Sequence, residues 1–158
     1  MSRTLSKKIK RIVIKLGSGT IAKHYMHPSA SGLVSLVEEI ATVRKQGVQV
    51  VLVSSGSIVL GLGEIKQNVR PSEVSSLQAL AAIGQNVLMN LYTQLLKKNK
   101  LCCAQILLTW DDFSDRLRYN NARHTIVKIL DYGMIPLINE NDTISTDEIK
   151  FGDNDKLS

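Results

Sequence analysis

The sequence predicts an α/β fold in which a mainly parallel sheet is covered by helices. Short apolar segments rich in Val, Ile and Leu have the length and composition of buried strands. Between them lie segments whose apolar residues recur with the period of an amphipathic helix. We expect strands at 11–16, 48–53, 101–109 and 134–138, and helices at 31–46, 58–62, 72–99 and 120–132. Strands that alternate with helices in this way are joined by right-handed crossovers into a parallel sheet.

Turn residues bound the expected strands. The first strand ends in Gly17-Ser18-Gly19, which predicts a glycine-rich turn, and the second ends in Ser54-Ser55-Gly56. The second strand is almost entirely apolar and rich in β-branched residues, which is typical of a strand covered on both faces. Pro136 in the last strand has no N–H group to donate to a ladder, so it predicts either a strand start or an edge position.

The expected helices carry start and stop signals. Ser29 or Ser31 can cap the helix at 31–46, and Gly47 can end it. The helix at 72–99 has a wide apolar stripe. This stripe consists of Val74, Leu77, Ala81, Gly84, Leu88, Leu91 and Leu95. Core packing and a subunit interface both explain it, and we expect a homo-oligomer.

Composition indicates one globular domain preceded by a basic tail at residues 1–10. The chain has 158 residues, of which 44% are hydrophobic and 22% charged, enough for one core. Its formal net charge is +6. The tail supplies part of that charge, and because few aromatic residues accompany it, we favour a solvated tail over a nucleic-acid-binding segment. No run approaches the roughly 18 apolar residues of a membrane span, and no signal sequence is evident, so we expect a cytoplasmic protein without membrane contact.

Cys102 and Cys103 are the only cysteines. Adjacent cysteines seldom bridge one another, and these two lie in an apolar run, so we expect buried free thiols of a reducing compartment. No second cysteine pair or histidine cluster accompanies them, and no residue of the chain is assigned as a metal ligand.

Polar residues follow three of the expected strands, where the carboxyl ends of parallel strands meet at one edge of the sheet. Lys15 and the glycine turn follow the first strand, Ser55-Gly56 the second, and Asn139-Glu140-Asn141-Asp142 the fourth. Ligands of open α/β sheets bind at this edge. The two glycines allow backbone N–H groups to approach phosphate oxygens, although an ordinary tight turn explains the same residues. This is not a Walker motif, because the lysine precedes the glycines. Ser55-Gly56 could form an anion-binding site at the start of a helix, and an ordinary serine cap of that helix explains the same residues.

Acidic residues gather at the end of the chain. Asp142, Asp153 and Asp155 would repel one another unless an ammonium group, a magnesium ion or a lysine lies between them; a solvated acidic loop is the alternative. The alternation of Asp and Asn around Asn154 is similar to a calcium loop, but the remaining spacing does not fit one. We also expect a short strand at 149–151 and the first turn of a helix at 155–158.

Six motifs together resemble the glutamate 5-kinases, a branch of the amino acid kinase family. The motifs are Val13-Ile14-Lys15-Leu16-Gly17-Ser18, Val53-Ser54-Ser55-Gly56-Ser57-Ile58, Leu80-Ala81-Ala82-Ile83-Gly84-Gln85, Asn120-Asn121-Ala122-Arg123, Ile138-Asn139-Glu140-Asn141-Asp142 and Ile149-Lys150-Phe151-Gly152-Asp153-Asn154-Asp155-Lys156-Leu157-Ser158. The resemblance runs from about residue 12 to the last residue, and the last two motifs are specific to this branch. It implies a layered α/β/α fold.

The resemblance further implies that ATP, with Mg²⁺, phosphorylates the side-chain carboxylate of L-glutamate to glutamyl 5-phosphate, the first step of proline synthesis. An already ionised carboxylate needs no base, so the task is positioning and charge neutralisation. The implied catalytic residues are Lys15, which would neutralise the transferring phosphoryl, and Asp155, which would orient the catalytic lysines. Lys15, Gly17, Ser18 and Gly19 would bind ATP phosphates. Ser55, Gly56, Asp142, Asp153 and Asn154 would bind glutamate, with Asp142 at its ammonium and Asn154 at its carboxylate.

The resemblance also gives an expectation about completeness. The family domain continues for roughly another hundred residues that carry the adenine pocket, so we expect 11–158 to be its amino-terminal, substrate-binding half with an incomplete nucleotide-binding half. We therefore expect this chain to be inactive alone. A non-catalytic fragment that assembles with full-length subunits through the helix at 72–99 is the alternative, and a basic nucleic-acid-binding module ranks last.

Overall fold

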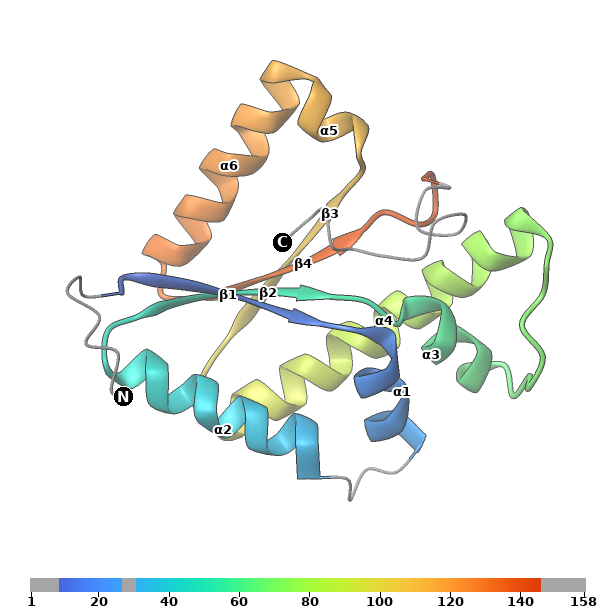
Figure 1. The fold of residues 1–158 in the computed structure, drawn as a ribbon, viewed down its shortest axis with the longest axis horizontal. Coiled ribbons are helices and arrows are strands. Elements are labelled where there is room, and N and C mark those ends of the chain that lie inside the picture. The colour runs from blue at the N-terminus through green and yellow to red at the C-terminus, as the bar shows by residue number, and fades with distance from the viewer. Residues whose placement is uncertain (1–8, 27–30, 146–158) are drawn as a thin grey trace, which may run out of the picture.

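The fold is a four-stranded parallel sheet with helices on both faces, seen in a computed structural model that describes residues 9–26 and 31–145 (Figure 1). The elements in chain order are β1 (Arg11–Leu16), α1 (Ser18–Met26), α2 (Ser31–Lys45), β2 (Gln49–Ser54), α3 (Ser57–Glu64), α4 (Val74–Lys98), β3 (Cys103–Leu108), α5 (Asp111–Ser114), α6 (Arg116–Asp131) and β4 (Ile135–Glu140). The strand order is β1-β2-β4-β3, and every pairing is parallel. The predicted α/β class is therefore confirmed.

The larger core lies between the sheet and the helices α1 to α4. Side chains of alternate strand residues reach this face, and Val50, Leu52, Ile135 and Leu137 are buried there. Helices α2 and α4 contribute most of the opposing apolar side chains, and these include Leu33, Val37, Ile40, Leu88, Tyr92 and Leu96. Gly47, with φ +80°, ends the turn after α2, as the sequence predicts.

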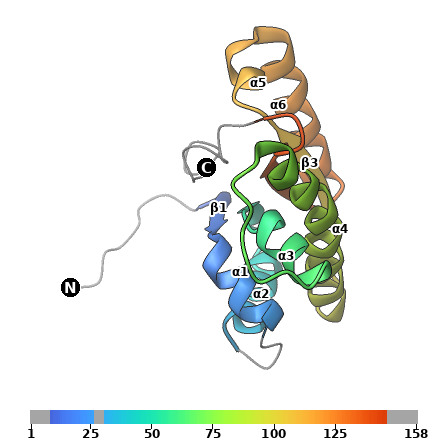
Figure 2. The ribbon, with the colours of Figure 1, turned by 90° about the vertical axis from the view of Figure 1, so that its right-hand side faces the viewer.

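The second face of the sheet is covered by α6, with α5 beside its start. Figures 1 and 2 show these two helices on the side of the sheet opposite α1 and α2. The core on this face is small and consists of Val51, Val53, Leu108, Leu130 and Ile138. Helix α6 begins after Asp115, whose side chain accepts a hydrogen bond of 2.8 Å from the backbone N–H of Arg118. The cap at Asp115 places the start of the helix before residue 120, where the sequence predicts it.

Two helices were not predicted from the sequence. Helix α1 occupies the place where a glycine-rich turn was expected, and the short α5 follows β3. Gly17 and Gly19 do not have positive φ, so the chain passes from β1 into α1 without a tight turn. The predicted glycine-rich turn is wrong because glycine is also tolerated at the start of a helix.

The edge position offered for Pro136 is wrong, and the strand-start alternative is right. Pro136 is the second residue of β4, which lies between β2 and β3. The pairing of β4 with β2 involves only Leu137 and Ile138, so the proline precedes that ladder. Pro136 is paired with Ala104 of β3, and its lack of an N–H group fits a β2 ladder that begins only at Leu137.

The apolar stripe of α4 packs within this chain. Leu77, Ala81, Gly84, Leu88 and Leu95 are buried, whereas Val74 is 37% exposed. Core packing accounts for the stripe. The cysteines are free, as expected, but Cys102 is exposed and Cys103 only half-buried, because they lie at the start of β3 at the edge of the described sheet. None of the helices in the described part of the chain combines the length and apolarity that a bilayer-spanning segment needs.

Candidate active site at the carboxyl edge of the sheet

Two helix starts lie side by side where β1 and β2 end. Helix α1 begins at Ser18 directly after β1, and α3 begins at Ser57 after Gly56. Gly56 adopts a left-handed conformation with φ +107°, and a Cβ there would lie 3.2 Å from Cβ of Ile21 and 3.5 Å from Cα of Ser18. A residue with a side chain would thus be strained and crowded. The glycine allows the two helix starts to pack closely.

This arrangement concentrates positive electrostatic potential. The first turn of a helix has N–H groups without intrahelical acceptors, and the helix dipole adds a partial positive charge. Gly17, Ser18 and Gly19 are exposed. Apart from the adjoining residues and the backbone of the helix itself, no described atom lies within 4 Å of a Cβ built on either glycine. Lys15 lies at the end of β1 beside them, in register with Val53. The edge above β1 can therefore receive an anionic group.

The loop after β4 brings a carboxylate to the start of α3. Asp142 is 2% exposed, and its Oδ2 accepts a hydrogen bond of 3.0 Å from Oγ of Ser57. The loop itself is fixed to β3, because the backbone N–H of Asn141 donates to the carbonyl of Leu108 at 2.8 Å. The carboxylate is therefore held at a defined position next to the two helix starts.

Buried polar side chains connect this loop to α4. Asn139 Nδ2 donates to Oε1 of Gln85 at 2.9 Å, and both side chains are buried. Nε2 of Gln85 is also buried and makes no hydrogen bond with a described residue. It borders a cavity of about 10 Å³, lined also by Ser57, Glu140 and Asp142, which is the size of one water molecule. A water there would give this N–H group an acceptor.

Further hydrogen bonds hold the ends of β2 and β4. Glu140 Oε1 accepts a hydrogen bond of 2.6 Å from Oγ of Ser145, so the loop closes back on the strand end. Ser54 Oγ and Tyr92 Oη are 2.9 Å apart beneath the start of α3. Burial raises the pKa of Tyr92 well above its usual value, because the phenolate would lose its hydration. The hydrogen bond with Ser54 opposes this in part. Tyr92 is thus a neutral, structural partner of Ser54.

The structure brings together many of the residues singled out from the sequence. Lys15, Gly17, Ser18, Gly19, Ser55, Gly56 and Asp142 all belong to the ends of β1, β2 and β4 or to the segments that follow them. Ser55 is buried, and its backbone N–H donates to the carbonyl of Leu16 at 3.0 Å. The helix cap expected from serine is instead Gly56, which makes no side-chain cap. Asp153, Asn154 and Asp155 lie outside the described residues, as does the strand expected at 149–151.

Sequence reasoning missed Ser57 and Gln85 as parts of this site. Ser57 follows Ser55-Gly56 at a helix start, where a serine is typical of a capping residue, so the sequence gives no sign of its bond to Asp142. The pairing of Gln85 with Asn139 spans 54 positions, and no local pattern reports such a contact. Within the described ranges, no group of three or more His, Cys, Asp or Glu side chains is arranged to hold a metal ion.

The arrangement suits a ligand that carries both charges. Helix starts and Lys15 provide for anionic groups, and the buried Asp142 provides for a cation. Residues 10–158 match the model of the amino acid kinase family. The chain belongs to the amino acid kinase family. This match covers nearly the whole chain, including all described residues except residue 9.

Three relatives carry the name glutamate 5-kinase. A glutamate 5-kinase of Marinomonas sp. is 47% identical over 150 residues, and one of Methylococcus capsulatus is 46% identical over 148 residues. A glutamate 5-kinase of Geobacter metallireducens is 46% identical over 158 residues. The alignments cover 95%, 94% and 100% of this chain, but only 40%, 40% and 42% of the three relatives. The chain therefore spans about two fifths of the length of these curated relatives.

Proposed function

We propose that this chain is the glutamate-binding part of an amino acid kinase that uses ATP to phosphorylate the side-chain carboxylate of L-glutamate, giving glutamyl 5-phosphate and ADP. The observation that carries the proposal is the position of the buried Asp142, hydrogen-bonded to Ser57 beside the adjoining starts of α1 and α3. The glutamate 5-kinase relatives, at 46–47% identity, support the same substrate.

The charges of the site match the charges of the substrate. Glutamate carries one ammonium and two carboxylates, and we assign the ammonium to Asp142, since a buried carboxylate attracts a cation strongly. Ser55 and Gly56 lie at the start of α3, which suits a carboxylate of the same molecule. Asp153 and Asn154 are proposed as further glutamate ligands on the family resemblance. A substrate bound in this way would be oriented at both ends.

The phosphate side of the site is assigned to the start of α1. Lys15 and the open backbone at Gly17, Ser18 and Gly19 fit the phosphates of a magnesium nucleotide, because no described atom fills the space above the two glycines. When bound, ATP with Mg²⁺ supplies the phosphoryl group. The ammonium group of Lys15 offsets the negative charge of the phosphoryl group, so that the anionic carboxylate of glutamate can approach it. Asp155 is proposed to orient the lysines.

Titration calorimetry with L-glutamate and glutarate tests the assignment of Asp142. Glutarate keeps both carboxylates but lacks the ammonium group. We expect the chain to prefer L-glutamate and Asp142→Asn to lose about tenfold or more of that preference, since the substitution removes the charge but keeps an acceptor for Ser57. Asp131→Asn, at the exposed end of α6, is the control and should bind both ligands normally.

Two results would contradict the proposal. The first is a chain that is folded by circular dichroism yet binds glutamate no better than glutarate. The second is an equal loss of affinity for both ligands in Asp142→Asn. A second assay measures glutamate-dependent ADP formation by the chain and by a version extended with the remaining sequence of the Marinomonas relative. We expect turnover only in the extended version. Turnover of other amino acids but not glutamate would overturn the substrate assignment.

A further inference from the structure

The buried face of α4 contains a single carboxamide. The buried residues of this helix are Leu77, Leu80, Ala81, Gly84, Gln85, Leu88, Tyr92, Leu95 and Leu96. Taking the primary amide of Gln85 out of water costs free energy, and a hydrogen bond within the protein does little more than offset that cost. An apolar side chain would avoid the cost altogether, so stability alone does not explain a glutamine at this position.

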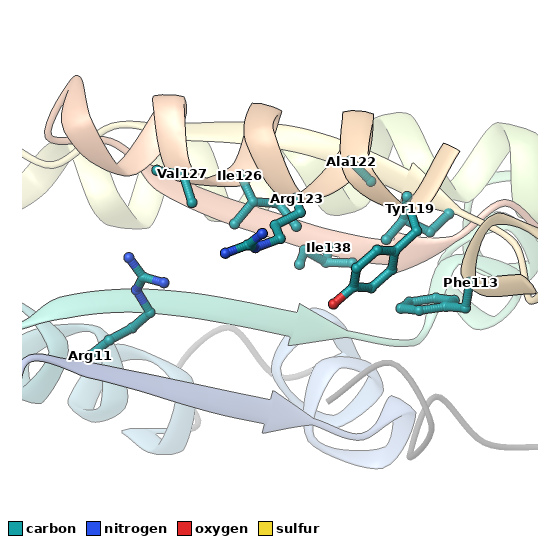
Figure 3. Close-up of a pocket in the computed structure, with 9 residues that line it drawn as sticks. Arg11, Phe113, Tyr119, Ala122, Arg123, Ile126, Val127 and Ile138 are labelled. Carbon is teal, nitrogen blue, oxygen red and sulfur yellow. The ribbon is translucent and has the colours of Figure 1, made fainter. Parts of the chain in front are cut away.

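The partner of Gln85 lies on β4, on the face of the sheet that α4 covers. Ile138 belongs to the opposite face, where it lines a groove beneath α6 (Figure 3). Successive side chains of a strand point to opposite faces, so Asn139 shares the face of Leu137 in the larger core. Its Nδ2 donates to Oε1 of Gln85 at 2.9 Å, and Asn139 is 1% exposed. The bond therefore fixes which end of the Asn139 carboxamide faces α4.

The residue before Gln85 contacts the start of α3. A Cβ built on Gly84 would collide with the carbonyl oxygen of Ser57, so the backbones of the two helices touch there. Ser57 in turn donates its hydroxyl hydrogen to Asp142 at 3.0 Å. These contacts close a ring that leads from Gly84 through Ser57 and Asp142 to Asn139 and back to Gln85. Two consecutive residues of α4 thus support both elements between which the carboxylate is held.

The chain between Asn139 and Asp142 is short enough to transmit a displacement. Only Glu140 and Asn141 separate the two residues, and three consecutive residues span at most about 10 Å. Gln85 and Asp142 also line the same cavity of about 10 Å³. A change of side chain at position 85 therefore acts on the carboxylate at short range.

We propose that Gln85 is a positioning residue of the substrate site, because it holds Asn139 against α4 and thereby sets where the carboxylate of Asp142 meets the ammonium group of the substrate. This inference rests on the proposed function, since it concerns the group of glutamate that is assigned to Asp142. Gln85 acts through Asn139 and makes no contact with the substrate. Its loss therefore lowers the affinity for a ligand with an ammonium group more than the affinity for one without.

Titration calorimetry with L-glutamate and glutarate separates positioning from a general structural role. Gln85→Met keeps the length of the side chain but removes the acceptor for Asn139. We expect the preference for L-glutamate over glutarate to fall by about fivefold or more, while the affinity for glutarate changes by less than about twofold. Gln94→Met is the matched control, because it removes a hydrogen bond of 3.3 Å to Asn90 at an exposed site of the same helix, and it should keep the full preference. Gln85→Ala serves in place of Gln85→Met if that variant folds poorly.

Two further variants test whether Gln85 acts through Asn139. Gln85→Glu keeps an acceptor for Asn139 and should retain the preference, because the added negative charge also favours an ammonium group. In a chain that already carries Asn139→Ala, Gln85→Met should change the preference no further, since the bond is already lost. Additive losses in the double variant would overturn the proposal, as would equal losses in Gln85→Glu and Gln85→Met.

Hydrogen exchange tests the same arrangement without a ligand. The amide of Asn141, which donates to the carbonyl of Leu108, should exchange at least about tenfold faster in Gln85→Met and at the original rate in Gln94→Met. Unchanged exchange at Asn141 would overturn the proposal, and so would an equal loss of affinity for both ligands in Gln85→Met. If the unsubstituted chain binds the two ligands alike, the proposed function is refuted, and the exchange rate of Asn141 then decides whether Gln85 holds the loop.

Discussion

Ser57 Oγ donates a hydrogen bond of 3.0 Å to Oδ2 of Asp142, which joins the first residue of α3 to the loop after β4. The two residues are 85 positions apart in the chain, and both are buried. The bond crosses from the end of β2 to the end of β4, which are neighbouring strands. It therefore fixes the carboxylate to the same rigid element that carries Gly56.

The first prediction concerns this bond. Ser57→Ala leaves the buried carboxylate of Asp142 with one donor fewer, so we expect the free energy of unfolding to fall by about 1–3 kcal/mol. Urea denaturation followed by circular dichroism measures it. Ser75→Ala is the control: Ser75 also donates to a carboxylate, that of Glu73, but at an exposed site, and its loss should stay within about 0.5 kcal/mol. Equal losses in the two variants would contradict a special role for the buried pair.

The second prediction concerns the contact between α3 and α4. A Cβ on Gly84 would lie 1.7 Å from the carbonyl oxygen of Ser57 and 2.4 Å from the backbone N of Gly61, and neither atom can move without the helix. Gly84→Ala should therefore destabilise the protein by about 3 kcal/mol or more, since overpacked backbone contacts separate the helices. Thermal unfolding of Gly32→Ala provides the control. Gly32 lies in α2, and a Cβ built on it meets no described atom within 4 Å beyond the adjoining residues and its own helix backbone. Alanine there should therefore be neutral or stabilising by up to about 1 kcal/mol. A small effect at Gly84 would show that the helices can shift.

The sheet could be predicted from the sequence because its strands are short apolar runs that alternate with helices. β1, β2 and β4 lie within one or two residues of their predicted bounds, and the ends of these strands do meet at one edge. Local sequence is sufficient for such a prediction, since a strand buried on both faces is an uninterrupted run of apolar residues.

The finer features could not be predicted because they depend on tertiary contacts. Helix α1 begins at Ser18, between Gly17 and Gly19, and two glycines among three residues predict a turn. The central position of β4 depends on pairing with both β2 and β3, which no local pattern around Pro136 reports. The Gln85–Asn139 and Ser57–Asp142 contacts arise only after the sheet has formed. Sequence reasoning thus locates the edge of the site but not the bonds that hold it.

The third prediction concerns pH. Burial raises the pKa of Tyr92, so the folded protein favours the neutral phenol more than the unfolded chain does. This contribution to stability is complete below the ordinary tyrosine pKa of about 10 and is lost as the pH rises above it. At neutral pH, Tyr92→Phe should lower the free energy of unfolding by about 1 kcal/mol, because it removes the hydrogen bond with Ser54. Between about pH 9.5 and 11, the stability of this variant should fall less steeply than that of the unsubstituted protein. Denaturation at several pH values measures the slope. Tyr132→Phe, at a side chain 69% exposed, should keep the original slope.

The fourth prediction concerns the adjacent cysteines. Burial raises the pKa of Cys103, and the hydrogen bond with Thr93 only partly offsets it, so less thiolate forms at a given pH. Cys102 is exposed. Because the thiolate is the reactive form, iodoacetamide at pH 8 should modify Cys102 first, and mass spectrometry of peptides can follow both sites. Cys103→Ser should retain the fast phase and Cys102→Ser only the slow one. The slow phase should also gain more from raising the pH to 9.5, since burial raises the pKa of Cys103. Equal alkylation rates in the two variants would show that the start of β3 opens faster than the thiol of Cys103 reacts. The burial of Cys103 would then have no effect on its reactivity.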